Sequence, residues 1–207
     1  FFIINFIMSK YYKLGDKIEI KYKVDDIELS DTSTITYYHQ DGYIFTCGHC
    51  FPKNALFDLG DLVYSSGFDT IDENKEIAII KVKPEYQYMF RPILLGNINN
   101  NCYNNKKATL IHMDKTYIGK IIGKINKELP IGKYKLSSND IFNHSITKLQ
   151  PPYYLVKHDN IEVKHGLSGS PWIVYDKEFK LLGTHIGKVK TNNNKFISYV
   201  KPIKNIL

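Results

Sequence analysis

Short hydrophobic or alternating runs, separated by turn residues, dominate the chain. In residues 17–24 (KIEIKYKV) an apolar side chain occupies every second position. This period of two is typical of strands with one buried face, and the period of 3.6 that marks amphipathic helices is nearly absent. Further runs of this kind lie at 33–38, 43–46, 76–83, 107–112, 116–125, 153–157, 171–175, 181–186 and 195–200. The pattern predicts an all-β protein, a barrel or a sandwich.

Two polar stretches interrupt the strand pattern. Residues 97–107 are rich in Asn and poor in apolar side chains, which is typical of a linker. We therefore expect a first β-barrel in residues 9–96 and a second in residues 108–207, with residues 1–8 a disordered or non-native extension. The stretch from Ser137 to Pro152 is also polar and irregular, and it predicts a long surface loop.

Composition narrows the function classes only slightly. The 207 residues carry a net charge of +7, but the basic residues are scattered and no run of five or more occurs. A solvated basic surface explains this better than a nucleic-acid site. The apolar stretch at the N-terminus is too short to span a bilayer, so we expect no membrane contact. Three cysteines are too few for a secreted disulfide scaffold. We expect a cytoplasmic, reducing location, and leave open whether the protein is viral or virion-associated.

Three motifs with catalytic chemistry follow one another along the chain. They are IFTCGHCF at 44–51, KEIAIIKV at 75–82 and GLSGSP at 166–171. A serine hydroxyl is a weak nucleophile that needs an adjacent base, usually histidine. The histidine needs a carboxylate to fix its tautomer. The motifs offer Ser168, His49 and Glu76 for these roles, and the N–H groups of Gly166 and Ser168 for stabilising an oxyanion.

These motifs resemble the histidine, acid and nucleophile segments of the chymotrypsin-like (trypsin-fold) serine proteases, in the same order. Residues 33–51 are similar to the histidine hairpin of bacterial-type members, and residues 166–187 to the nucleophile loop and following hairpin of glutamyl endopeptidases. The resemblance implies two antiparallel six-stranded barrels with the active site in the cleft between them. It implies a serine endopeptidase that acts on polypeptides through an acyl-enzyme and needs no cofactor or metal.

Two departures from the family pattern affect the site. The acid is Glu76 where most members have aspartate, although viral relatives use glutamate. Nearby carboxylates could replace it if the strand register differs, namely Asp72, Asp69 and Asp61. Leu167 replaces the acidic residue that pairs with a freed N-terminal amine in zymogens, so we expect activity without N-terminal clipping.

The resemblance leaves the substrate preference open between two interpretations. In glutamyl endopeptidases and picornavirus-type main proteases, a histidine in the same context as His185 lines the primary specificity pocket. It donates a hydrogen bond to Glu or Gln at P1. Thr184 precedes it and is a candidate pocket residue. Glu162 lies six residues before Ser168, where trypsin carries the carboxylate that selects Lys and Arg. We favour His185, with an imidazolium preferring Glu.

Other functions remain as alternatives. Cys47-Gly48-His49-Cys50 is identical to the redox tetrapeptide of protein disulfide isomerases, but strand-like sequence and Pro52 surround it. Zinc binding by the same residues lacks a partner motif. An inactive protease fold that serves binding is the third alternative. Four remaining histidines are expected on the surface or in loops, namely His112, His144, His158 and His165.

Overall fold

The computed structural model describes residues 11–51, 56–58, 76–93, 95–98, 103–137, 140–145, 149–163 and 166–203. Within these ranges nearly all regular structure is β, and the helical segments are two short 3-10 turns, η1 (Gly48–Cys50) and η2 (Pro84–Met89). The predicted all-β class is therefore confirmed. No helix in these ranges is long and apolar enough to cross a membrane.

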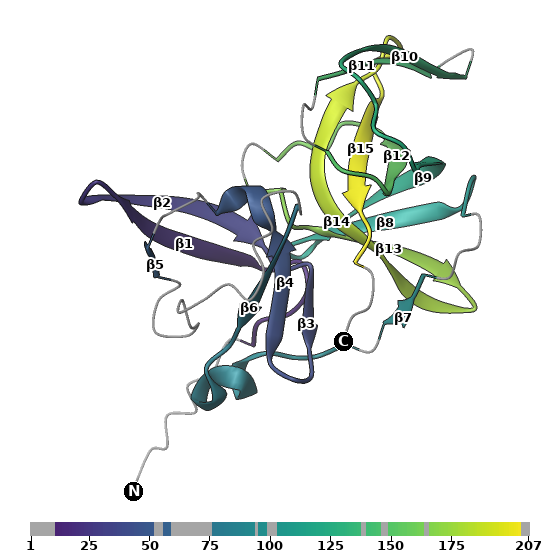
Figure 1. Cartoon of the computed structure of the whole chain (residues 1–207). Helices are drawn as coiled ribbons and strands as arrows, with labels where there is room; N and C mark the ends of the chain where they lie inside the picture. The colour runs from purple at the N-terminus through teal and green to yellow at the C-terminus, as the bar shows by residue number, and fades with distance from the viewer. Residues whose placement is uncertain are drawn as a thin grey trace, which may run out of the picture.

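The C-terminal half forms a closed barrel of six strands (Figure 1). Its strands pair in the order β13-β8-β9-β12-β15-β14, and β14 pairs back with β13 to close the ring. Strand β7 (Gly96–Asn97) adds to β14 in parallel from outside. The barrel strands are β8 (Lys107–His112), β9 (Lys115–Ile125), β12 (Tyr153–His158), β13 (Pro171–Asp176), β14 (Glu178–Lys190) and β15 (Phe196–Lys201).

The N-terminal half contributes six strands in two three-stranded sheets among the residues described. One sheet has the order β2-β1-β5 and the other β3-β4-β6. The hairpin of β1 and β2 extends away from the rest of the molecule (Figure 1). The strands are β1 (Lys17–Val24), β2 (Ile27–Thr34), β3 (Tyr37–His39), β4 (Tyr43–Cys47), β5 (Leu56–Asp58) and β6 (Ile77–Lys81).

One apolar cluster joins the two halves. It contains Ile20, Ile44 and Ile80 from the first half together with Leu155 and Tyr199 from the second, all at most 2% exposed. Burial of apolar side chains stabilises their contact by roughly 25 cal/mol per Å². The shared cluster therefore holds the halves against each other, and side chains at their junction can keep a fixed geometry.

The boundaries differ from the predicted ones in the irregular regions. Residues 137–152 were expected to form a loop, but β10 (Gly132–Ser137) and β11 (Asp140–His144) form a hairpin at the end of the barrel (Figure 1). In β11 the buried positions include Asp140 and His144, so polar residues occupy the inner face and conceal the alternation. Of the predicted linker, residues 99–102 lie outside the described ranges, as does the predicted extension 1–8.

Candidate active site

The histidine and the acid are brought together by the pairing of β4 with β6. Cys47 lies opposite Ile77 at the end of this ladder. One residue further, the N–H of Gly48 donates to the carbonyl of Glu76 over 2.8 Å. The chain then turns through η1, which carries His49. The strand register thus fixes the backbones of His49 and Glu76 side by side.

The side chains of the three catalytic candidates form one hydrogen-bonded line. Nδ1 of His49 lies 3.2 Å from Oε2 of Glu76, and Nε2 lies 2.9 Å from Oγ of Ser168. The Glu76 side chain is 17% exposed and that of His49 is 43% exposed. A base can therefore accept the serine proton while the carboxylate holds its other nitrogen. The alternative acids lie outside the described residues, namely Asp61, Asp69 and Asp72.

The loop that carries Ser168 requires glycine on both sides. Gly166 has φ +78° and Gly169 has φ +90°, in the left-handed region that side chains disfavour. A Cβ on Gly169 would lie 2.2 Å from the carbonyl oxygen of Thr34. The loop backbone can approach the first half this closely only without a side chain, and the approach places Ser168 within reach of His49.

Hydroxyl groups of the first half hold this loop in place through hydrogen bonds. Thr34 donates to the carbonyl of Gly166, and Thr36 to that of Gly169, each over 2.6 Å. Thr184 donates to the Thr36 hydroxyl over 3.1 Å. It therefore supports the loop through Thr36 and does not line a pocket. The roles of Thr34 and Thr36 were not predicted from the sequence. The signal was the concentration of hydroxyl side chains in residues 33–36 (STIT), which is unusual for a strand facing a core.

The two predicted oxyanion donors are consistent with their assigned role. Within the described part of the chain, neither the N–H of Gly166 nor that of Ser168 donates to a backbone carbonyl. Ser168 lies in the tight turn in which the N–H of Ser170 donates to the carbonyl of Leu167 over 3.0 Å, and Gly166 directly precedes this turn. Unused N–H groups beside a nucleophile are what a developing oxyanion requires.

Two buried thiols flank the histidine. The sulfur of Cys47 lies 2.9 Å from Nδ1 of His49, and Cys50 is 5% exposed. Burial raises the pKa of the Cys47 thiol. Hydrogen bonding, from Cys47 foremost and also from His49, lowers the pKa of Cys50 to about 5. Contact with Cys50 and then with Glu76 raises the pKa of His49 to about 10. Cys50 and Glu76 therefore favour the charged ring, which is the form that His49 takes once it has accepted the serine proton.

The fold does not favour the disulfide-exchange alternative. In disulfide isomerases a helix N-terminus activates one thiol, whereas Cys47 and Cys50 here flank a 3-10 turn of three residues. Cys47 is fully buried at the end of a β-strand, where a protein disulfide cannot reach its sulfur.

His185 is deeply buried beside the nucleophile loop. Its backbone exchanges hydrogen bonds of 2.9 Å with Gly169 and Ser170. Its side chain is 2% exposed, and Nδ1 accepts a hydrogen bond of 3.3 Å from the indole N–H of Trp172. Burial lowers the pKa of His185 to about 3, so the ring is neutral at neutral pH. The expectation of an imidazolium at this position was therefore wrong, because among the described residues no carboxylate offsets the cost of burying the charge.

Glu162, the residue of the trypsin-like interpretation, is exposed and lines a hollow of about 540 Å³. Lys17, His112 and Lys115 line the same hollow, whereas none of the three catalytic candidates does. Asp114 also lines this hollow, so the carboxylate of Glu162 lies in a mixed charged surface. Nothing in this arrangement directs it at a substrate held by Ser168.

Three of the remaining histidines are buried, contrary to expectation. His112 contacts the hydroxyl of Ser170 at 3.0 Å, and His158 contacts that of Ser198 at 2.7 Å. His144 is also buried, at 1% exposure, and lies 2.9 Å from the Tyr199 hydroxyl. Hydroxyl partners allow these rings to be buried without charge, and burial lowers the pKa of His112 and His158. His165 lies outside the described residues.

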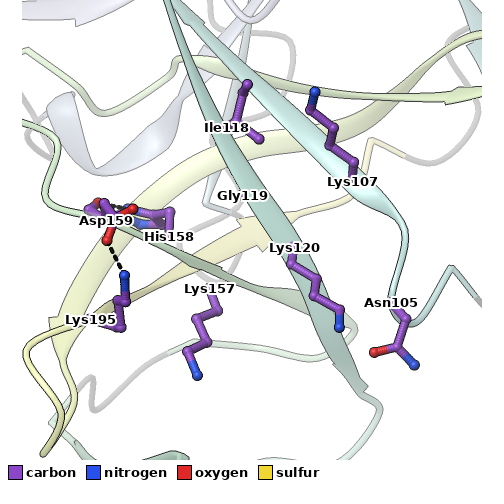
Figure 2. A pocket seen from close by; sticks show the side chains of 9 residues that line it. All are labelled: Asn105, Lys107, Ile118, Gly119, Lys120, Lys157, His158, Asp159 and Lys195. Atoms are coloured by element: carbon purple, nitrogen blue, oxygen red, sulfur yellow. Dashed lines mark hydrogen bonds and ion pairs between the residues drawn. The ribbon is translucent and has the colours of Figure 1, made fainter.

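A second hollow on the barrel has four lysines among the nine residues that line it (Figure 2). Three lysines are cross-strand neighbours, because Lys120 of β9 lies opposite both Lys107 of β8 and Lys157 of β12. Lys195 pairs with Asp159 at the edge of this hollow of about 390 Å³. Four lysines thus gather at this hollow, which includes none of the catalytic candidates.

Comparison with known proteins supports the fold. No protein-family model and no curated protein sequence matches the chain. Among solved structures, Thermobifida fusca Protease A aligns with a TM-score of 0.53 and 12% identity over 95% of both chains. The active form of the Rv3671c protease from M. tuberculosis gives 0.51 at 15% identity, over 94% of this chain and 77% of that one. Nocardiopsis protease gives 0.50 at 10% identity over 95% of both. The chain has the fold of the chymotrypsin-like serine proteases, as the motifs predicted.

Proposed function

We propose that the protein is a serine endopeptidase that hydrolyses polypeptides through Ser168, His49 and Glu76. The observation that carries this proposal is the continuous line from Glu76 Oε2 through His49 to Ser168 Oγ, with contacts of 3.2 and 2.9 Å. It joins residues from both halves of a fold that proteases use. If the three residues had only a structural role in a buried polar core, neither the serine nor the histidine would need to be accessible to substrate.

The proposed mechanism follows from the position of each group. Oγ of Ser168 attacks the scissile carbonyl carbon while Nε2 of His49 accepts the hydroxyl proton. The N–H groups of Gly166 and Ser168 stabilise the oxyanion of the tetrahedral intermediate. His49 then donates its proton to the leaving amine, and water hydrolyses the acyl-enzyme by the same route. Glu76 accepts from Nδ1–H throughout, which fixes the ring and stabilises its charged form.

For the substrate we propose Gln, and more weakly Glu, at P1. Because Nδ1 of His185 accepts the indole hydrogen of Trp172, the proton of the neutral ring resides on Nε2. That N–H is a donor of fixed orientation next to the nucleophile loop. A neutral donor suits the carboxamide oxygen of Gln, whereas the carboxylate of Glu would be buried without a countercharge. The neutral state thus reverses the order expected from an imidazolium.

A peptide library with every residue type at P1, digested by reduced wild-type protein, tests this proposal. We expect cleavage after Gln, with Glu second, and no cleavage by Ser168→Ala purified in parallel. Cleavage after Lys or Arg that is lost in Glu162→Gln would keep the endopeptidase but replace the specificity. A library left intact by wild-type protein would contradict the proposed activity.

A further inference from the structure

The ring of His49 belongs to two arrangements at once. It links Glu76 to Ser168, and it also forms part of a thiol–histidine cluster with Cys47 and Cys50. The two sulfur atoms and a ring nitrogen all lie within 4.8 Å of one another. Both cysteines are free thiols. In the ranges described, this is the one group of three such ligands found close enough to hold a metal ion.

The ligand set has a definite preference among metals. Two thiolates and one imidazole are soft to borderline ligands, which favour Zn²⁺ over Mg²⁺ or Ca²⁺. We propose that the thiol–histidine cluster binds Zn²⁺ and that bound zinc inhibits the peptidase, the inhibition resting on the proposed function. The sequence shows no second ligand motif, but three protein ligands suffice when solvent takes the fourth position.

The contact between Cys47 and His49 needs only a small adjustment to accept the ion. With Zn–S of about 2.3 Å and Zn–N of about 2.0–2.1 Å, a tetrahedral site separates sulfur from nitrogen by about 3.6 Å. The sulfur of Cys47 now lies 2.9 Å from Nδ1 of His49. The ring and the thiol therefore have to separate by less than about 1 Å, which a rotation of the partly exposed His49 side chain can supply. The thiol protons pass to the buffer on binding.

Zinc on Nδ1 of His49 would disrupt the contacts of this ring with both Glu76 and Ser168. Nδ1 would give its lone pair to the metal and could no longer donate a hydrogen to Glu76. The remaining ring proton would then reside on Nε2, the nitrogen 2.9 Å from Oγ of Ser168. An N–H cannot accept the serine proton, so the base is lost. Metal binding and catalysis thus compete for one imidazole.

Metal binding can be measured independently of catalysis in Ser168→Ala, which keeps all three ligands. Reduced, metal-free Ser168→Ala is titrated with Co²⁺ and followed by absorption. We expect one equivalent to produce a thiolate-to-cobalt charge-transfer band and the d–d bands of a tetrahedral site, both removed by Zn²⁺. Absence of the charge-transfer band would overturn the proposed site.

Variants of the cysteines assign the band to its ligands. In the Ser168→Ala background, Cys50→Ser and Cys47→Ala should each lose the band. Cys102→Ser should keep it, because the three proposed ligands do not include Cys102. Cys50→Ser alters the more exposed of the two thiols and serves if Cys47→Ala fails to fold. A band that survives in Cys50→Ser but disappears in Cys102→Ser would also overturn the assignment.

Peptide hydrolysis by the wild-type protein tests the inhibition. We expect Zn²⁺ to abolish hydrolysis, a chelator to restore it, and Mg²⁺ at equal concentration to have no effect. Relative to its own metal-free rate, Cys50→Ser should need at least about tenfold more Zn²⁺ for half-inhibition. An active enzyme that keeps its rate when zinc has displaced all cobalt would overturn the inhibition. If the metal-free wild-type protein cleaves no peptide, the proposed function fails while the cobalt result still stands.

Discussion

The hydroxyl of Thr36 donates to the carbonyl oxygen of Gly169 over 2.6 Å, and this bond joins the first half of the chain to the loop of the proposed nucleophile. Both residues are buried. The bond allows Gly169 to hold its left-handed conformation against the backbone of Thr34. A residue without any catalytic group therefore helps to position Ser168.

Thr36→Val should consequently lower activity as well as stability. A buried carbonyl that loses its donor costs about 1–3 kcal/mol, which unfolding in urea would register. Displacement of Ser168 should reduce kcat by about 10²-fold with little change in KM. Thr116→Val, which makes the same substitution at an exposed position of β9, is the control. Equal kcat in the two variants would show that Thr36 contributes to stability alone.

Substitution of Glu76 tests the assignment of the acid. Glu76→Gln keeps the size of the side chain but removes the charge that stabilises the imidazolium, and its amide can select the wrong tautomer. We expect kcat to fall by about 10³–10⁴-fold in Glu76→Gln, the scale seen when a triad acid is neutralised. Glu76→Asp should show a smaller loss. A silent Glu76→Gln together with a severely impaired Asp72→Asn would move the acid to Asp72.

His185 should determine specificity without responding to ordinary changes of pH. Because burial lowers its pKa to about 3, the ring is neutral from mildly acidic to alkaline pH. The preference for Gln over Glu, as a ratio of kcat/KM, should therefore stay constant between pH 5 and 9 once substrate titration is considered. A preference that shifts from Glu to Gln as pH rises through neutrality would indicate an imidazolium instead.

Removal of the ring provides the matching test. His185→Ala should reduce kcat/KM for Gln substrates by at least about 10²-fold relative to apolar ones, since hydrogen-bonding sites discriminate sharply. His144→Ala removes another buried histidine, one that contacts Tyr199, and should leave that ratio unchanged. Equal effects of the two substitutions would contradict a role of His185 in recognition.

Buried neutral histidines should also make the protein sensitive to mild acid. The unfolded chain binds a proton at His185 near pH 6.5, whereas the folded protein resists protonation until about pH 3. Stability is therefore lost as pH falls below 6.5, by up to about 1.4 kcal/mol per pH unit for this group. Urea unfolding between pH 7 and 4.5 should show this slope, and His185→Gln should reduce it. An unchanged slope in His185→Gln would exclude His185 as its source.

The sequence predicted those features that rest on local patterns. Strands such as β1 and β8 show alternation because one face is buried, and the three catalytic motifs lie at ends of strands that the alternation located. Strand β2 was missed beyond its last residues, because most of its side chains are exposed and show no alternation. Its pairing with β1 depends on Asp25 and Asp26, which both adopt positive φ in the connecting turn.

Features that depend on partners distant in sequence could not be predicted in the same way. The Thr36 hydroxyl and the neutral His185 ring take their roles from Gly169 and Trp172, and no local pattern identifies either of these partners. The closeness of the Cys47 and Cys50 thiols to the ring of His49 likewise appears only when η1 bends the chain after β4.

Covalent labelling of Ser168 tests the central claim most directly. Reduced, metal-free protein is treated with a fluorophosphonate, which reacts with an activated serine hydroxyl, and the adduct is located by peptide mass mapping. The account predicts one adduct per chain, on Ser168, that is absent from Ser168→Ala and forms much more slowly in Glu76→Gln. Wild-type protein that stays unlabelled, or that is labelled no faster than Ser168→Ala, would contradict it.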